Sequence, residues 1–115
     1  MRYKKYNGTD KYHFRIYKKS IGHPFIVVAV SETTDDNGEV VISGYMLTHS
    51  LLRVTEKPGA YERLNINPNP NDKRLSFVNT FRINNVPAEF FSKPYPKWHL
   101  SKEDELIIDN LEEHR

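Results

Sequence analysis

Two short segments of this sequence, residues 22–24 and 47–50, carry side chains that can move protons. Imidazole groups titrate near neutral pH, so two histidines can serve as general base and general acid without a metal ion. With RNA as the substrate, the base would take the proton of a 2′-hydroxyl and the acid would protonate the leaving 5′-oxygen. Hydroxyl groups and arginines would stabilise the negative charge that develops at phosphorus. The candidate residues in the two segments are His23, Thr48, His49 and Ser50.

Two strands of one hairpin are expected to position these residues. Residues 25–30 form a continuous apolar run, which is typical of a strand buried on both faces. Residues 33–38 include an Asn-Gly dipeptide suited to a hairpin loop, and residues 40–47 form the returning strand. Because the loop lies near the middle, antiparallel pairing brings the start of the first strand beside the end of the second. We therefore expect the four candidate residues to meet at one edge of a sheet.

The same residues also have a simpler interpretation. A Thr-His-Ser sequence after a strand often hydrogen-bonds its own backbone in a turn, and two histidines in 115 residues can meet by chance. Both interpretations stay open at this level. The chain has no cysteine, and no carboxylate or third histidine lies at the spacing of zinc ligands. The sequence therefore predicts neither a metal site nor a cofactor.

The first 20 residues are strongly basic, although the net charge of the whole chain is only +2. Tyrosines are interleaved with the charges, a pattern that can follow a phosphate backbone while the rings stack on bases. Lysine also protects exposed strand edges from aggregation, so an ordinary solvated strand explains the pattern equally well. Residues 101–115 are acidic in compensation. The basic residues of the first segment are Arg2, Lys4, Lys5, Lys11, Arg15, Lys18 and Lys19, against Asp10 alone.

The rest of the pattern predicts a mainly β chain with a C-terminal helix. Strands are expected over 61–66 and 75–83, a loop over 67–72, a helical turn over 86–91 and an extended segment over 92–97. Ser101 is a good helix N-cap, and an apolar stripe follows it. We expect a small SH3-like barrel of antiparallel strands in a single domain, 1–115, with residues 1–10 as a flexible basic segment. No apolar run approaches the roughly 20 residues that span a membrane, and the absence of cysteine fits the cytoplasm.

The order of these motifs resembles the MazF/PemK (Kid) family of toxin endoribonucleases from toxin–antitoxin modules. Residues 22–28 are similar to the Arg-Pro opening of a strand in that family, and residues 41–50 to its strand that ends in threonine. Residues 76–83 resemble a later strand that enters a basic turn, and residues 100–111 resemble the closing helix.

The resemblance implies an SH3-like barrel, usually a homodimer, that binds single-stranded RNA across the dimer groove and is neutralised by a cognate antitoxin. It implies metal-free cleavage to 2′,3′-cyclic phosphate and 5′-hydroxyl ends. Thr48 matches the family's catalytic threonine, but His23 stands where the family commonly has a catalytic arginine. Either His23 takes over proton transfer, or Arg82 or Arg53 supplies the positive charge, or activity is lost.

The sequence thus leads to three hypotheses. The first is a cytoplasmic, metal-independent endoribonuclease. The second is a non-catalytic SH3-like module that binds RNA or a protein through the same surface. The third is a subunit of a larger complex that docks through the acidic helix 101–113. For the first, the predicted catalytic residues are His23, Thr48 and His49, and the predicted RNA contacts are Ser50, Arg53, Arg82, Lys18 and Lys19.

Overall fold

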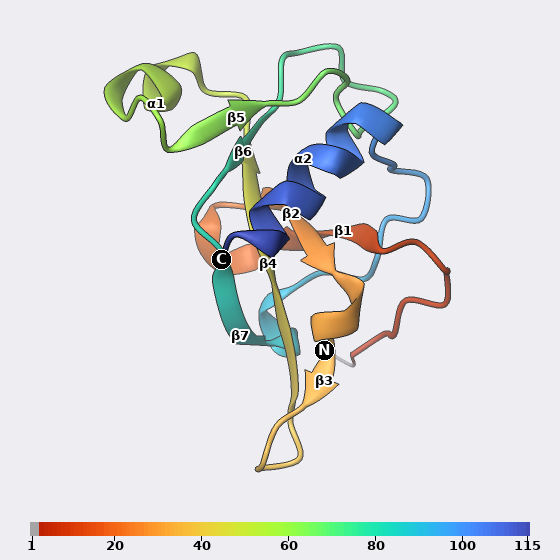
Figure 1. The fold of residues 1–115 in the computed structure, drawn as a ribbon. Helices are drawn as coiled ribbons and strands as arrows, with labels where there is room; N and C mark the ends of the chain where they lie inside the picture. Colours follow the sequence, from red (N-terminus) through yellow and green to blue (C-terminus); the bar gives the residue numbers. More distant parts are fainter. Residues whose placement is uncertain (1–2) are drawn as a thin grey trace.

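The longest strand, β4 (Val40–Thr48), lies at the centre of the sheet and pairs with four other strands (Figure 1). The computed structural model describes residues 3–115, and within them the sheet has seven strands, in the order β1-β2-β4-β6-β5, with β3 and β7 also paired to β4. All pairings between these strands are antiparallel, and the described strands do not close into a barrel. The mainly antiparallel β class is therefore confirmed. The remaining strands are β1 (Tyr12–Tyr17), β2 (His23–Val28), β3 (Thr33–Thr34), β5 (Tyr61–Arg63), β6 (Phe77–Asn79) and β7 (Ile83–Pro87).

The predicted pairing between residues 25–30 and 40–47 is confirmed as β2 against β4. Phe25 pairs with Met46, and Val27 pairs with Gly44. Side chains of β2 alternate between two apolar clusters: Ile26 and Val28 lie in one, and Phe25 and Val27 lie in the other. Both faces of β2 are thus covered, which explains its continuous apolar sequence. The strand lies two residues earlier than predicted, because it begins at His23 and ends at Val28, where the 3-10 turn η2 (Ala29–Ser31) follows.

The predicted C-terminal helix is confirmed as α2 (Lys102–Glu113), which packs on the sheet through the buried Ile108. Ser101 caps it as expected, because its side chain accepts a hydrogen bond from the backbone N–H of Asp104 at 3.1 Å. The fully buried Asp104 carboxylate accepts hydrogen bonds from the backbone N–H groups of Asn65 and Ile66, at 2.7 and 3.1 Å. The first turn of α2 therefore anchors the loop that follows β5.

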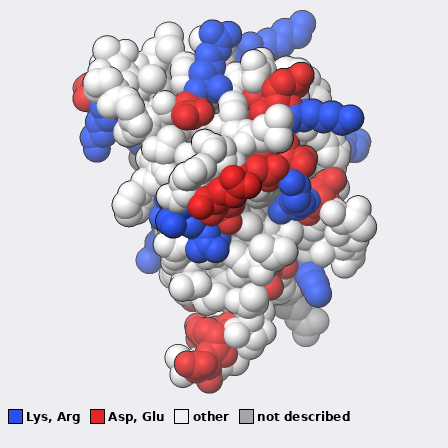
Figure 2. All heavy atoms as spheres, viewed as in Figure 1, with Lys and Arg blue, Asp and Glu red and all other residues white. Residues whose placement is uncertain are grey.

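Charged groups on α2 also tie the helix to the sheet. Asp109 accepts hydrogen bonds from Tyr12 and Lys11, at 2.6 and 2.9 Å. Glu112 accepts hydrogen bonds from Tyr45 and from Arg82, at 2.5 and 2.7 Å. Figure 2 shows acidic side chains along this helix with basic side chains beside them. Much of the acidic charge of residues 101–115 is therefore used inside the fold.

Several segments differ from the sequence prediction. The strand expected over 75–83 is two strands, β6 and β7, separated by residues 80–82, and the strand expected over 61–66 stops at Arg63. The helical turn expected over 86–91 is shorter, because β7 runs to Pro87 and only η3 (Ala88–Phe90) is helical. A short helix, α1 (Leu51–Glu56), follows β4 where no element was expected. A further 3-10 turn, η1 (Lys18–Ser20), separates β1 from β2.

The N-terminal segment from residue 3 packs against the sheet. Tyr3 donates a hydrogen bond to Glu32, and the Lys4 carbonyl accepts one from Arg15 at 2.8 Å. Arg15 is only 1% exposed and also pairs with Glu32 at 3.2 Å. Met1 and Arg2, part of the predicted flexible basic segment, lie outside the described residues. Within residues 3–115, no helix has both the length and the apolar character needed to cross a membrane.

Gly44 allows β2 and β4 to approach closely. A β-carbon at this position would lie 1.8 Å from the carbonyl oxygen of Ile26 and 2.8 Å from Cε1 of Phe25. The pairing of β4 with β7 is irregular at the same place, between Ile42 and Gly44. The backbone oxygen of Ile26 cannot withdraw without breaking the pairing of β2 with β4, so only glycine fits here.

Replacing Gly44 with alanine tests this constraint. We expect Gly44→Ala to lower the free energy of unfolding by about 3 kcal/mol or more, because the added methyl group overlaps backbone atoms. Urea denaturation measures the change. Gly38→Ala is the matched control: Gly38 has φ +80° but open space around it, so a loss of about 1 kcal/mol is expected there. Equal losses in the two variants would contradict the argument.

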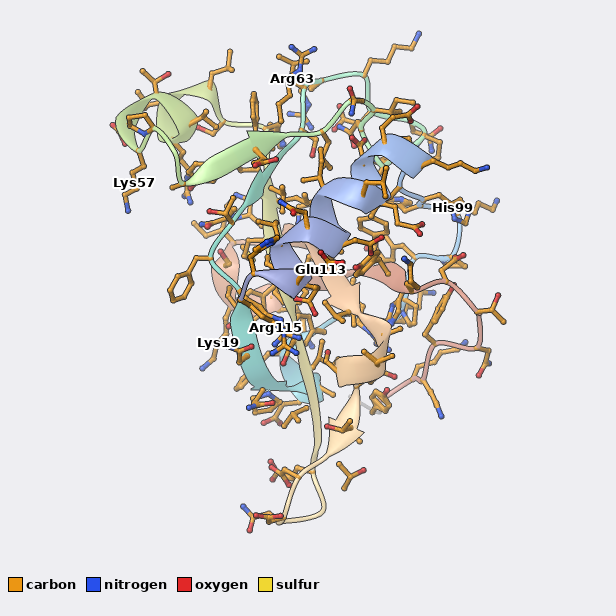
Figure 3. The ribbon with its side chains drawn as sticks, viewed as in Figure 1. Lys19, Lys57, Arg63, His99, Glu113 and Arg115 are labelled. Carbon is orange, nitrogen blue, oxygen red and sulfur yellow. The ribbon has the colours of Figure 1, made fainter. Side chains whose placement is uncertain are left out.

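Acid should weaken the docking of α2. Burial raises the pKa of Glu112, but its hydrogen bonds from Arg82 and Tyr45 outweigh that effect, and the net pKa lies below the ordinary value of 4.5. The stabilisation is therefore fully present above pH 4.5 and is lost as the pH falls through the lower folded pKa. We expect Glu112→Gln to flatten the loss of stability with acid, measured by urea denaturation at several pH values. Glu113→Gln, an exposed neighbour (Figure 3), should leave the wild-type slope unchanged, and an equal effect of both substitutions would refute the assignment.

Candidate functional site

The pairing of β2 with β4 brings His23 and Thr48 to the same place. Phe25 lies opposite Met46, and the same antiparallel register continued by two residues sets His23 across from Thr48. His23 is the first residue of β2 and Thr48 is the last residue of β4. The register therefore sets His23 opposite Thr48 at one edge of the sheet, as the hairpin argument predicts.

His23, Thr48 and Arg53 line one pocket of about 150 Å³. They come from three different elements, β2, β4 and α1, and so are gathered only by the fold. The pocket combines an imidazole, a hydroxyl and a guanidinium group. These are the groups needed to take a proton, to donate a hydrogen bond and to stabilise a negative phosphate. The other lining residues are Ser20, Met46, Leu47, Tyr61 and Asn79.

A chain of local hydrogen bonds sets the position of Arg53. The Thr48 side chain accepts a hydrogen bond from the backbone N–H of Ser50 at 3.1 Å. Ser50 is the N-cap of α1, and its hydroxyl accepts from the backbone N–H of Arg53 at 3.4 Å. The simple interpretation of Thr-His-Ser as a backbone-bonded turn is therefore correct for Thr48 and Ser50. That turn is also what starts α1 and brings Arg53 back beside the end of β4.

His23 is the half-buried proton acceptor of the pocket. Its Nδ1 atom lies 3.2 Å from the Ser20 hydroxyl. Burial lowers the pKa of His23 below 6.5, and the positive charge of Arg53 and the proximity of His49 lower it further, while a hydrogen bond with the Ser20 backbone partly opposes them. The imidazole is consequently neutral at pH 7 and able to accept a proton.

His49 lines a second pocket of about 220 Å³, which also includes Thr48 but not His23. Leu47 and Thr48 line both pockets, so the two are neighbours. His49 is exposed and lies near Asp72, whose pKa is lowered to about 2, mainly by its hydrogen bonds with Arg74. The two histidines thus line neighbouring pockets rather than share one. The other lining residues are Gly22, Pro24, Asn67, Asn69, Asp72, Arg74, Ser76 and Trp98.

Four predicted RNA-contact residues, Ser50, Arg82, Lys18 and Lys19, line neither pocket. Arg82 pairs with Glu112, and its side chain is only 13% exposed. Lys18 and Lys19 belong to η1, just before Ser20, and the Lys19 ammonium group lies 4.0 Å from the centre of the Phe90 ring. Of the two arginines considered as the source of positive charge, the structure therefore places Arg53, and not Arg82, beside His23 and Thr48.

Two residues that line the His23 pocket could not be predicted from the sequence. Tyr61 and Asn79 reach the first pocket because β5 pairs with β6, where they are direct partners. No local sequence pattern predicts the pairing of β5 with β6. Arg53 is different, because Ser50 followed by two leucines is a recognisable helix start and would have placed Arg53 on the first turn of α1.

Within residues 3–115, no group of three or more His, Asp or Glu side chains is arranged to hold a metal ion. Comparisons of the chain with protein-family models, with curated proteins and with solved structures find no match.

The positive charge of Arg53 should lower the pKa of His23 measurably. We expect the His23 ring proton signals in NMR to titrate with a midpoint below 6.5, the ordinary value. Arg53→Gln should raise that midpoint, because removing a nearby positive charge makes protonation easier. Lys57→Gln, which removes a charge just after the same helix, should leave it in place, and His23→Gln assigns the signal. A midpoint at or above 6.5 in the wild type contradicts the placement of Arg53.

Proposed function

We propose that this protein is a metal-independent endoribonuclease that cleaves single-stranded RNA at the His23–Thr48 edge. The observation that carries the proposal is the shared pocket of His23, Thr48 and Arg53, which joins a proton acceptor, a hydroxyl and a positive charge. The order of motifs shared with the MazF/PemK family supports the same activity.

The geometry suits an in-line reaction at one phosphodiester group. Neutral His23 takes the proton of the 2′-hydroxyl, and the 2′-oxygen attacks the adjacent phosphorus. Arg53 and the Thr48 hydroxyl stabilise the negative charge on the phosphoryl oxygens. The bond from phosphorus to the 5′-oxygen breaks, and His49 donates the proton that this oxygen needs. Base and acid are separate groups in such a reaction, and the two histidines lie in neighbouring pockets that both include Thr48. The products are a 2′,3′-cyclic phosphate and a 5′-hydroxyl.

The proposal extends to the finer properties implied by the family resemblance. These are an SH3-like barrel arrangement of the strands, a homodimer with an RNA-binding groove, neutralisation by a cognate antitoxin, and action in the cytoplasm. Support for the barrel arrangement comes from the antiparallel strand order and the closing helix α2. The alternative is a module that uses the same pocket to bind RNA or a protein without cleaving it.

An RNase assay in the presence of EDTA separates these functions. We expect the wild-type protein to cleave labelled single-stranded RNA and to leave cyclic-phosphate ends, which periodate-resistant termini reveal. His23→Ala should lower the rate at least 100-fold through loss of the base. Arg53→Ala should lower it by a similar factor through loss of charge stabilisation. Thr48→Ala should also be impaired, by about tenfold or more, because the hydroxyl donor is gone.

Matched substitutions away from the pocket provide the controls. His114→Ala on the end of α2 and Thr34→Ala on β3 remove the same side-chain types and should keep the wild-type rate. Circular dichroism verifies that each variant is folded. RNA that is bound but stays intact, with affinity that falls steeply with salt, would favour the binding module. Cleavage that is indifferent to His23→Ala and Thr48→Ala would overturn the proposed site.

A further inference from the structure

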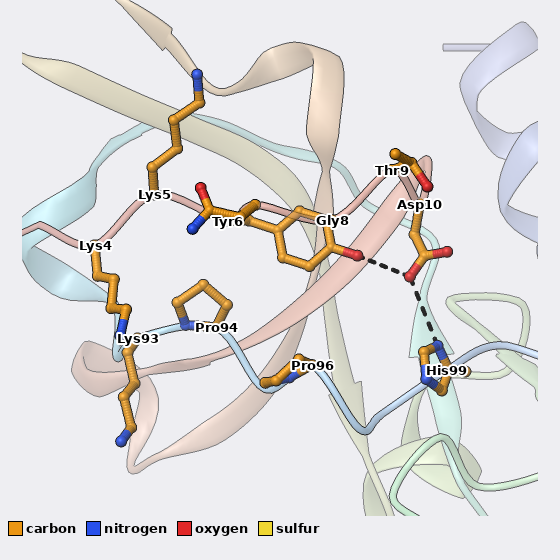
Figure 4. Close-up of a pocket in the computed structure, with 11 residues that line it drawn as sticks. Lys4, Lys5, Tyr6, Gly8, Thr9, Asp10, Lys93, Pro94, Pro96 and His99 are labelled. Atoms are coloured by element: carbon orange, nitrogen blue, oxygen red, sulfur yellow. Dashed lines mark hydrogen bonds and ion pairs between the residues drawn. The ribbon is translucent and has the colours of Figure 1, made fainter.

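A pocket of about 570 Å³ lies between the N-terminal segment, residues 4–10, and residues 93–99 (Figure 4). It is much larger than the pocket of about 150 Å³ beside His23, and the two share no lining residue. Its volume falls in the range typical of sites for small-molecule ligands, about 300–1,000 Å³. The basic, tyrosine-containing segment noted in the sequence therefore forms one wall of a built cavity.

Buried contacts hold this wall in place. The Lys4 carbonyl accepts a hydrogen bond from Nη2 of the buried Arg15, and Tyr3 donates one to Glu32. Arg15 also donates to the carbonyl of Ser92, which directly precedes the second wall. One buried guanidinium group thus fastens both walls of the pocket to the sheet.

Tyr6 provides a fixed aromatic surface in this pocket. Its ring stacks on the buried ring of His13, with centroids 4.1 Å apart and planes 12° apart. Its hydroxyl donates a hydrogen bond to Asp10 at 2.8 Å. A β-carbon on Gly8 would lie 2.0 Å from the Tyr6 hydroxyl oxygen, so glycine is required there for the ring to lie across the loop. Pro94 on the facing segment adds an apolar ring (Figure 4).

The charge of the pocket is unevenly distributed. Lys4, Lys5 and Lys93 line it, and none of them takes part in an ion pair within residues 3–115. Asp10 is the one carboxylate among the lining residues, and it is already bound by Tyr6 and by His99 at 3.6 Å. Figure 4 shows Lys4 and Lys93 at one end and the Asp10–His99 pair at the other. An anion at the lysine end would relieve repulsion between like charges.

We propose that this pocket binds a nucleoside phosphate, with the base against Tyr6 and Pro94 and the phosphate on Lys4 and Lys93. A flat apolar surface with ammonium groups at one end is what stacking of a base and pairing of its phosphate require. A free nucleotide and a nucleotide within a strand present the same chemistry. The site is separate from the His23 pocket, so it does not depend on RNA cleavage.

Calorimetric titration of the full chain distinguishes the two ligand sources. AMP and UMP serve as free nucleotides, a 5′-phosphorylated 2′-O-methyl tetranucleotide serves as an uncleavable strand, and inorganic phosphate tests the anion alone. We expect at least one nucleotide probe to bind more tightly than phosphate. Binding of the free nucleotides assigns a small-molecule ligand, and binding of the tetranucleotide alone assigns a strand contact. Failure of all nucleotide probes to bind, or phosphate binding equally well, overturns the proposal.

Substitutions locate the binding. Lys4→Ala combined with Lys93→Ala should weaken nucleotide binding at least tenfold, and Tyr6→Leu about tenfold through lost stacking. Gly8→Ala displaces the Tyr6 ring without changing the charge and should weaken binding by a similar factor. It tests the role of the ring even if Tyr6→Leu fails to fold. Lys57→Ala with Lys102→Ala removes two charges elsewhere and should change nothing. His23→Ala should keep full affinity even if it abolishes cleavage, so the two proposals fail independently. Unchanged affinity in the Lys4/Lys93 variant refutes this site.

Discussion

The close contact of β2 with β4 is the constraint on which the rest of the molecule depends. Apolar side chains of β2 alternate between two clusters, so a slip of one residue would exchange their faces. Gly44 adds a steric limit, because only its missing side chain leaves room for the Ile26 carbonyl. Pattern and sterics together fix one register, and that register sets His23 against Thr48. The candidate site is therefore a direct consequence of how the core packs.

Electrostatics then decide which charged residues remain available to a ligand. Asp109 and Glu112 are turned to the sheet, where they bind Lys11 and Arg82. Through Lys11, this pairing links the basic start of the chain to its acidic end. It weakens the hypothesis that helix 101–113 is a docking surface, since its inner carboxylates are occupied. It also engages Arg82 in an ion pair with Glu112 and leaves Arg53 as the arginine beside His23 and Thr48.

The sequence was informative where one local pattern sufficed. The apolar run of β2, the hairpin loop and the Ser101 cap each identify their element within a few residues. The pattern failed where distant residues decide the structure. Arg15 was compatible with a solvated strand, but it is buried because Glu32, 17 positions later, neutralises it. The strand expected over 75–83 breaks at 80–82 because β6 and β7 pair with different parts of β4. Whether a sheet closes into a barrel likewise depends on pairing between distant strands, and the described strands here do not close.

Pocket size restricts what the His23–Thr48 edge can act on. At about 150 Å³, the pocket is too small to enclose a nucleotide, since sites for small ligands usually exceed about 300 Å³. A single phosphodiester group can enter it, while the attached sugars and bases must rest outside, for instance in the adjoining pocket beside His49. Binding energy for a reaction here must then come from parts of the substrate remote from phosphorus. A polymer supplies such parts and a free nucleotide does not, so the proposed ribonuclease activity requires a strand rather than a small phosphodiester.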